Sequence, residues 1–292
     1  MRFLSLFLSL LALPFAVAAP LANETTTDGD VEAHGCNNTL TAEEASEIEA
    51  RIESELARAD LPDFLSDSSR TAPIRVEWHI IAPSATAPGA LSNGQVLASI
   101  SALNTYYSSI GIQFYLGNIT RTWNPSWFFL ASQGNPLDTS MKNLLHRGTR
   151  RTLNVYSVNL GGNPERGYAT WPWNVAANLN RDGVVIRYRT VPGGGEPNYS
   201  QGKTLVHHVG HWLGLYHVFQ GNSCGGPGDY VLDTPPQLTA SFGCPNFKNT
   251  CPGGGPDSIR NFMDMTYDWC KYLFTYRQGV RARQLAWIYR GL

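Results

Sequence analysis

The stretch HHVGHWLGLYH, residues 207–217, places three histidines at a spacing that suits a single metal ion. The surrounding residues have the pattern of a helix, on which positions four apart project from the same face, so His207 and His211 can reach one ion. Gly214 can adopt a left-handed turn that a side chain would resist, and this turn brings in His217 as a third ligand. Three imidazoles with a fourth position left open are typical of a catalytic zinc site.

The remaining histidines show no such spacing. Isolated histidines are usually ordinary core or surface residues, whereas three at helical spacing around a glycine rarely arise by chance. We therefore expect no metal role for His34, His79 and His146. His208 directly follows His207, and we expect its side chain to point away from the face that binds the metal.

The start of the chain has the composition of a secretory signal peptide. Arg2 gives a positive start, residues 3–13 are apolar, and Ala-Val-Ala at 16–18 forms a small-residue cleavage site. The apolar run is too short to span a bilayer, and no later stretch is apolar enough, so we expect a secreted protein without a membrane anchor. The net charge of -1 gives no electrostatic case for binding nucleic acid.

The composition predicts three parts: a signal peptide over residues 1–19, a pro-segment or N-terminal arm over 20–70, and one catalytic-sized domain over 71–292. The second part is polar and acidic, with one amphipathic helix for which Thr41 and Glu44 form a capping box. A Ser/Asp run at 66–69 makes a linker.

Strands and helices alternate irregularly through the third part, which indicates an α/β or α+β domain. Apolar alternation and β-rich runs predict strands at 74–80, 113–116, 153–158 and 184–186. Helical spacing predicts helices at 96–110, 141–145, 204–215 and 279–288.

The histidine motif resembles the zinc signature of the metzincin proteases, H-E-x-x-H-x-x-G-x-x-H, at every fixed position but one. The exception is His208, where the family has the glutamate that acts as general base. A metzincin also has a methionine turn beneath the zinc, and Asn-Phe-Met-Asp at 261–264 fits that turn with Met263 as its methionine. The resemblance implies an α+β fold with a twisted mixed sheet, an active-site helix and a Met-turn.

Further motifs resemble the pappalysin-like, or M43, branch of that family. They are DYVLDTPP at 229–236, FGCP at 242–245, QGVR at 278–281, GYAT at 167–170 and DGVV at 182–185. This resemblance extends from about residue 71 to the end of the chain. It implies a secreted zinc endopeptidase that acts on extracellular proteins or peptides, and we expect a monomer.

The chain has five cysteines, four of which can form bridges in a secreted protein. Spacing alone leaves three pairings open. The family resemblance implies Cys224 with Cys251 and Cys244 with Cys270. It also implies a calcium site, to which the chain would contribute Asp229, Asp233 and the carbonyl of Thr234. A turn capped by the two aspartates explains the same residues equally well.

Cys36 is left over, and it resembles the pro-segment cysteine that occupies the open zinc position in related zymogens. Asn37 follows it where the family usually has glycine, so the alternative is a free or intermolecular cysteine. Asn37 also belongs to one of four N-glycosylation triplets, which begin at Asn23, Asn37, Asn118 and Asn198.

Two positions that the family uses for catalysis are altered here. His208 replaces the general base, and Met265 stands where the family commonly has a tyrosine; Tyr267 either compensates or packs under the loop. Two hypotheses follow. The protein is a secreted zinc endopeptidase with weak or lost activity, or it is a non-catalytic zinc-binding protein that serves as a peptide-binding, decoy or interaction module.

Overall fold

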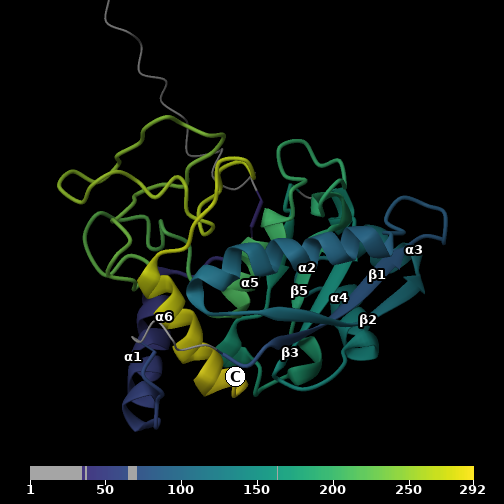
Figure 1. Ribbon diagram of the computed structural model, residues 1–292, viewed down its shortest axis with the longest axis horizontal. Helices are drawn as coiled ribbons and strands as arrows, with labels where there is room; N and C mark the ends of the chain where they lie inside the picture. Colours follow the sequence, from purple (N-terminus) through teal and green to yellow (C-terminus); the bar gives the residue numbers. More distant parts are fainter. Residues whose placement is uncertain (1–34, 37, 65–70, 163) are drawn as a thin grey trace, which may run out of the picture.

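The computed structural model describes residues 35–36, 38–64, 71–162 and 164–292 (Figure 1). The expected signal peptide, Asn23, His34, Asn37 and the expected linker at 66–69 lie outside these residues. Within the described residues, no helix is long and apolar enough to cross a membrane.

A five-stranded sheet in the order β2-β1-β3-β5-β4 forms the centre of the molecule. The first four of these strands run parallel to one another, whereas β4 pairs antiparallel with β5 and forms one edge. The strands are β1 (Ile74–Ala82), β2 (Phe114–Trp123), β3 (Thr152–Val158), β4 (Gly167–Ala169) and β5 (Val184–Arg187). This mixed sheet confirms the α+β fold expected from the sequence.

Side chains that alternate along the central strands enter two separate cores. Val155 and Val184 pack into one core with the helices α2 and α5, whereas Tyr156 and Val185 pack into a second core with α3 and α4. Successive residues of a strand point to opposite faces, so both faces of the sheet are covered. The helices are α2 (Asn93–Tyr107), α3 (Pro125–Leu130), α4 (Pro136–Leu145) and α5 (Lys203–Trp212).

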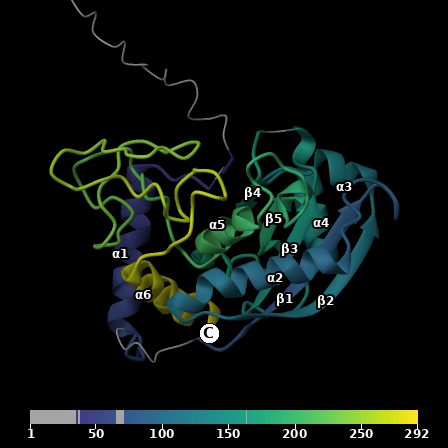
Figure 2. The same ribbon diagram turned by 45° about the horizontal axis from the view of Figure 1, so that its top comes forward.

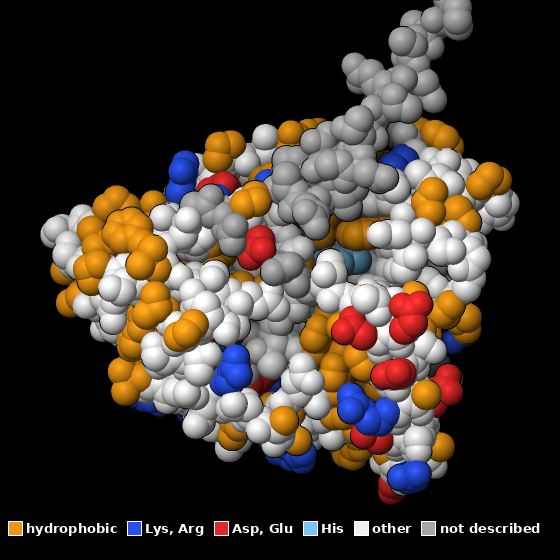
Figure 3. Space-filling view, turned by 180° about the vertical axis from the view of Figure 1, so that it is seen from behind, with side chains coloured by type: hydrophobic (Ala, Val, Ile, Leu, Met, Phe, Trp, Pro, Cys, Tyr) orange, Lys and Arg blue, Asp and Glu red, His pale blue; other side chains and the backbone are white. Residues whose placement is uncertain are grey.

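The N-terminal helix α1 (Ala42–Arg58) lies beside the C-terminal helix α6 (Tyr276–Leu285) at one end of the molecule, where charged side chains gather on the surface (Figures 1 and 3). The expected capping box of Thr41 and Glu44 is present. Glu49 of α1 is buried and forms a salt bridge of 2.6 Å with Arg281 of α6, and it accepts a hydrogen bond from the Tyr216 hydroxyl.

Between α5 and α6 the chain has little regular structure (Figure 1). Two disulfides, Cys224–Cys251 and Cys244–Cys270, hold this region together. They are the pairs that the family resemblance implies, and Cys36 is in neither bridge. Short 3-10 turns connect the elements at Ser108–Ile110, Leu160–Gly162, Pro172–Asn174, Leu179–Arg181 and Tyr188–Thr190, and a π-helical turn at Ala286–Arg290 follows α6.

Several element boundaries differ from the sequence-based expectation. The active-site helix ends at Trp212 rather than 215, because the left-handed turn at Gly214 (φ 92°) breaks it. Strand β2 extends seven residues beyond 116, to Trp123, because it pairs along the whole of the long strand β1. The helices α4 and α6 begin earlier than expected, at caps supplied by Asn135 and Thr275. Helix α3 and strand β4 were not predicted.

Candidate metal centre

Three imidazoles converge beside α5, as the motif predicts. The Nε2 atoms of His207 and His211 lie 3.1 Å apart, and His217 Nε2 lies 3.1 and 3.2 Å from them. Gly214 has the positive φ that brings the chain round to His217. Figures 1 and 2 show α5 next to β4 and β5, so the sheet edge borders the site.

The triangle of Nε2 atoms has the size that a tetrahedral zinc ion requires. Zinc–nitrogen bonds of about 2.0–2.1 Å at tetrahedral angles separate two ligand nitrogens by about 3.3 Å. All three imidazoles are at least 97% buried. Burial first, and for His207 and His217 the neighbouring histidines as well, lowers the pKa of each well below its usual range, to about 3 for His211. The rings are therefore neutral, as metal binding requires, and the donor set fits zinc.

Backbone carbonyls orient two of the rings. His207 Nδ1 lies 2.7 Å from the Phe262 carbonyl, and His211 Nδ1 lies 2.8 Å from the Leu215 carbonyl. Because a carbonyl can only accept, each Nδ1 carries the proton and each Nε2 keeps its lone pair for a metal.

The predicted methionine turn lies under the active-site helix. Met263 is fully buried and packs against Gly210, where an added Cβ would come within 2.5 Å of its sulfur. The Asn261 side chain accepts the Met263 N–H and fixes the turn. Helix and turn thus approach as closely as they do because residue 210 has no side chain.

The expectation that His208 points away from the metal face is wrong. Its Nδ1 lies 3.7 Å from Cys36 Sγ, and one ligand atom of each of His208, Cys36, His207 and His211 lies within 4.8 Å of the others. Neighbouring residues on a helix are about 100° apart rather than opposite, so His208 flanks the same groove. Among the described residues, this cluster contains no carboxylate.

Two cations face His208 from outside its helix. Burial lowers the pKa of His208 well below its usual range, and His211, Lys271 and Arg166 lower it further. The rest of the ring packs against β4, where a Cβ on Gly167 would lie 2.6–2.7 Å from its Cδ2 and Nε2. His208 therefore sits in a tight environment that disfavours an added proton.

Cys36 reaches the metal centre from the N-terminal segment. Its sulfur lies 3.3 Å from His211 Nε2, and its backbone forms a parallel bridge with Gly167 of the edge strand. The Asn38 side chain, two residues on, bonds both the N–H and the carbonyl of Ala169, each at 2.7 Å. Burial raises the pKa of the thiol to about 12.

Comparisons with known proteins agree with this geometry. The family model for peptidase M43, described as pregnancy-associated plasma protein-A, matches residues 149–286. Extracellular metalloprotease 1 of Coccidioides posadasii is 42% identical over 287 residues, covering 94% of this chain and 95% of its own length. An extracellular metalloprotease of Arthroderma otae is 40% identical, covering 77% of this chain and 82% of its own length. The chain belongs to the M43 metalloprotease family.

Solved structures extend the likeness to the N-terminal part. A promirolysin variant of Tannerella forsythia matches with a TM-score of 0.73 at 29% identity, covering 88% of this chain and 95% of that one. Mature mirolysin in complex with a cleaved peptide matches with a TM-score of 0.62 at 31% identity, covering 73% and 91%. The protein is thus a zinc metalloprotease family member with a metzincin-like fold. Its curated relatives are named extracellular, which agrees with the predicted location.

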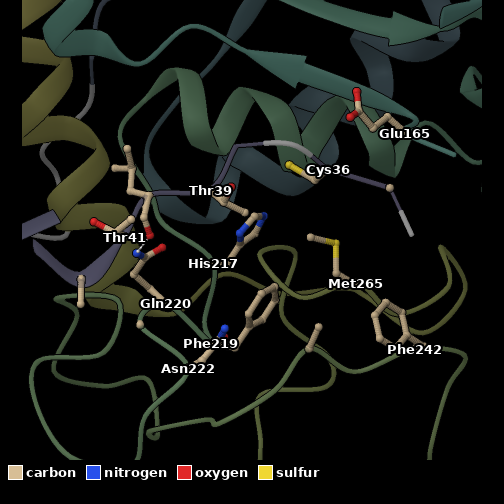
Figure 4. Close-up of a pocket in the computed structure, with 15 residues that line it drawn as sticks. Cys36, Thr39, Thr41, Glu165, His217, Phe219, Gln220, Asn222, Phe242 and Met265 are labelled. Carbon is tan, nitrogen blue, oxygen red and sulfur yellow. Dashed lines mark hydrogen bonds between the residues drawn. The ribbon is translucent and has the colours of Figure 1, made fainter. Parts of the chain in front are cut away.

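Two hollows of this M43 protein adjoin the metal centre. The larger, of about 500 Å³, is lined by His217, Phe219, Met265 and the carboxylate of Glu165, and is crossed by the N-terminal segment (Figure 4). Glu165 is not part of the cluster of ligand atoms around the imidazoles. The smaller lies on the His208 side and includes Lys271 and Met265. Tyr267 lines neither hollow; it packs edge-on against Tyr199, as the simpler alternative for it proposes. Sequence reasoning missed Lys271, because a single lysine in a loop gives no pattern.

The proposed calcium ligands have separate partners among the described residues. Asp229 accepts hydrogen bonds from the Thr234 hydroxyl and the Val231 N–H, and burial raises its pKa to about 7. Asp233 accepts from the Thr275 hydroxyl and the Arg277 N–H at the start of α6. Calcium binding at this loop stays a prediction.

Of the described glycosylation sites, Asn118 and Asn198 are both exposed.

Proposed function

We propose that this protein is a secreted, zinc-binding M43 protein whose peptide-bond hydrolysis is weak or lost because His208 stands where the family's general base belongs. His207, His211 and His217 would hold the zinc through Nε2. The ion would supply the polarised, acidic water that such proteases use. The observation that carries the proposal is the absence of a carboxylate from the described cluster around these atoms.

His208 is a poor substitute for a glutamate in this position. A general base must accept a proton from the attacking water and pass it to the leaving amine. A proton on His208 would add a positive charge beside Lys271, Arg166 and the metal, whereas a proton on a glutamate would remove a negative one. Losing a general base typically lowers the rate about 10²–10⁴-fold.

Met265 replaces a second group that the family uses for hydrolysis, the tyrosine hydroxyl. It lines both hollows beside the metal, but its thioether cannot donate a hydrogen bond to a developing oxyanion. Among the described residues that line the two hollows, Tyr199 is the one tyrosine. Its hydroxyl donates to the Met265 carbonyl at 3.3 Å. Hydrolysis here would therefore proceed without either of the family's usual groups.

We further propose that residues 1–19 are a signal peptide, 20–70 a pro-segment and 71–292 the metalloprotease domain, and that Cys36 keeps the protein latent. The Cys36 sulfur lies 3.3 Å from His211 Nε2, which supports a role as fourth zinc ligand, and a thiolate is a strong zinc ligand. Zinc would lower the pKa of this thiol, which burial and, to a smaller extent, the charge of Glu165 raise. The Glu49–Arg281 salt bridge holds α1 against the domain and supports the same docking.

One distance supports weak rather than lost hydrolysis. His208 Nδ1 lies 3.7 Å from the sulfur, close enough for an imidazole to reach a water in that position after a small shift. The alternative is a non-catalytic protein that binds zinc and peptides as a decoy or interaction module.

One activity measurement separates the two. The folded full chain is cleaved near residue 70 by an added protease, which is then inhibited, and casein turnover is compared with that of His211→Ala. Turnover above this metal-deficient background supports a weak protease, and equal rates support the non-catalytic protein. Turnover at the rate of an ordinary M43 protease contradicts the proposal.

A further inference from the structure

The smaller hollow beside His208 contains two cationic side chains that the zinc chemistry does not use. Arg166, Tyr199, Thr204, Met265 and Lys271 line it together with His207, His208 and the N-terminal residues Gly35 and Cys36. We propose that this hollow binds the carboxylate of a Glu or Asp side chain in an extracellular peptide, next to the residue held at the metal. The inference rests on the proposed function, because it supplies the class of peptide.

Lys271 is the first reason. The residue is 4% exposed, and its ammonium forms one hydrogen bond among the described residues, a long one of 3.5 Å to the Asp264 carbonyl. An ammonium has three donors, and a buried one without strong partners is costly. Asp268 and Asp264 attract it, but neither forms a salt bridge with it. The Asp268 carboxylate accepts the Gln201 N–H, and the Asp264 carboxylate accepts the Ser241 N–H.

Arg166 is the second reason. Its guanidinium lies 3.5 Å from the centre of the Tyr199 ring, which holds it at the hollow by a cation–π contact. Its Nε is buried and has no acceptor within the described part of the chain. The lining therefore brings together two positive charges and no carboxylate. A carboxylate is the ligand that satisfies such donors by charge-assisted hydrogen bonds.

The N-terminal segment leaves these cations without a side-chain partner. Gly35 covers the hollow with φ 115°, and a Cβ there would collide with the Arg166 guanidinium. The Gly35 carbonyl accepts the Arg166 N–H at 2.9 Å, and Cys36 pairs with Gly167. At Gly35 and Cys36, the segment thus contacts the sheet edge through backbone atoms and offers no carboxylate to the two cations.

A peptide that replaces the segment can pair with the same edge. Strand β4 ends the sheet, so its free side can accept an extended chain, with backbone bonds giving affinity and adjacent pockets giving specificity. In the N-terminal segment, Cys36 lies beside the metal centre, and Gly35 lies over the smaller hollow. A side chain one position from the metal-bound residue therefore projects toward Lys271 and Arg166, and a carboxylate there meets both.

The main experiment measures peptide binding rather than turnover. The folded full chain is cleaved near residue 70, loaded with zinc, and titrated with fluorescent peptides that differ only in one Glu, Gln or Lys. We expect the Glu peptides to bind about tenfold more tightly than the Gln peptides, equivalent to about 1.4 kcal/mol. In Lys271→Met this preference should disappear, and in Lys271→Glu it should shift to Lys. Equal binding of the three peptides, or a preference for Lys in the wild type, overturns the proposal.

A second measurement needs no cleavage. In the uncleaved chain, Lys271→Met removes an ammonium with weak partners, so the melting temperature should stay the same or rise, and Lys271→Arg serves as the charge-preserving control. A fall of several degrees in Lys271→Met alone would show that the ammonium holds the loop together and is not free for a ligand. Neither readout depends on hydrolysis. Efficient casein turnover would therefore refute the proposed function without affecting this test. Absence of the Glu preference in the wild type would refute the carboxylate site without affecting the proposed function.

Discussion

The metal centre has a side that binds the ion and a side that faces the substrate, and the two differ in how many of the expected functional groups they contain. On the ligand side, the three imidazoles converge, and the carbonyls of Phe262 and Leu215 fix the protons of two of them. On the substrate side, the side chains that line the smaller hollow include an imidazole, a thioether and an ammonium, from His208, Met265 and Lys271. The first set fits a metal, and the second lacks the groups that hydrolysis uses.

This difference teaches that holding zinc and using it depend on separate residues. The ligand side is built into the core, where Met263 packs against α5 and Gly214 packs against Leu285. The substrate side borders two hollows, and its side chains can change without altering the triangle of Nε2 atoms. A protein can therefore keep the centre and change its chemistry.

The largest effect should come from breaking the ligand side. His211→Ala removes the nitrogen that lies 3.1 Å from both other Nε2 atoms, so we expect zinc affinity to fall at least about 100-fold. Metal analysis after dialysis against a chelator measures it. His208→Ala is the matched control and should retain zinc, because His208 is not part of the Nε2 triangle. Undiminished zinc in His211→Ala would refute the ligand assignment.

Packing beneath the ligand side gives the next effect. Gly210→Ala would place a Cβ 2.5 Å from the Met263 sulfur, and overpacking of this kind costs about 1–3 kcal/mol. Urea unfolding of the zinc-loaded full chain measures the loss. Gly94→Ala on α2 is the control, since its Cβ would meet only Ser92 Oγ at 3.7 Å, and it should be neutral or stabilising. Equal stability of the two variants would mean that the helix and the Met-turn are not in close contact.

The sequence predicted the ligand side well and the substrate side poorly, for a physical reason. Helical spacing and the need for a glycine turn place His207, His211 and His217 from local rules alone. The orientation of His208 depends on the edge strand β4, which was not predicted, and on contact with Gly167. Lys271 reaches the hollow through a loop held by disulfides, and no periodicity describes such a loop.

A histidine that belongs to neither side, His79, should make the stability of the fold depend on pH. Burial lowers the pKa of His79 to about 4, whereas in the unfolded chain it is about 6.5. Between these values the unfolded state binds the extra proton, so stability falls as the pH drops from 6.5 toward 4, by up to about 3 kcal/mol. Urea unfolding of His79→Gln and wild type with saturating zinc should show a difference that shrinks as the pH falls. A difference that is constant with pH would refute this assignment.

The smallest change should come where the two sides meet, at Cys36. We expect the cobalt-substituted full chain to show a thiolate-to-cobalt charge-transfer absorption that Cys36→Ser lacks, with little change in stability. His208→Ala is the control and should keep the band. A wild-type spectrum without that band would show that Cys36 does not ligate the metal and would remove the proposed latency.

The central claim, that zinc binding is retained while the base is lost, is tested most directly by casein turnover of wild type beside His208→Glu. Both full chains are folded, cleaved near residue 70 and matched for zinc content. We predict a gain of about two orders of magnitude in His208→Glu, the typical value of a well-placed general base, with the remaining shortfall due to Met265. Efficient cleavage by the wild type, with no gain in His208→Glu, would show that another group is a competent base and would contradict the account.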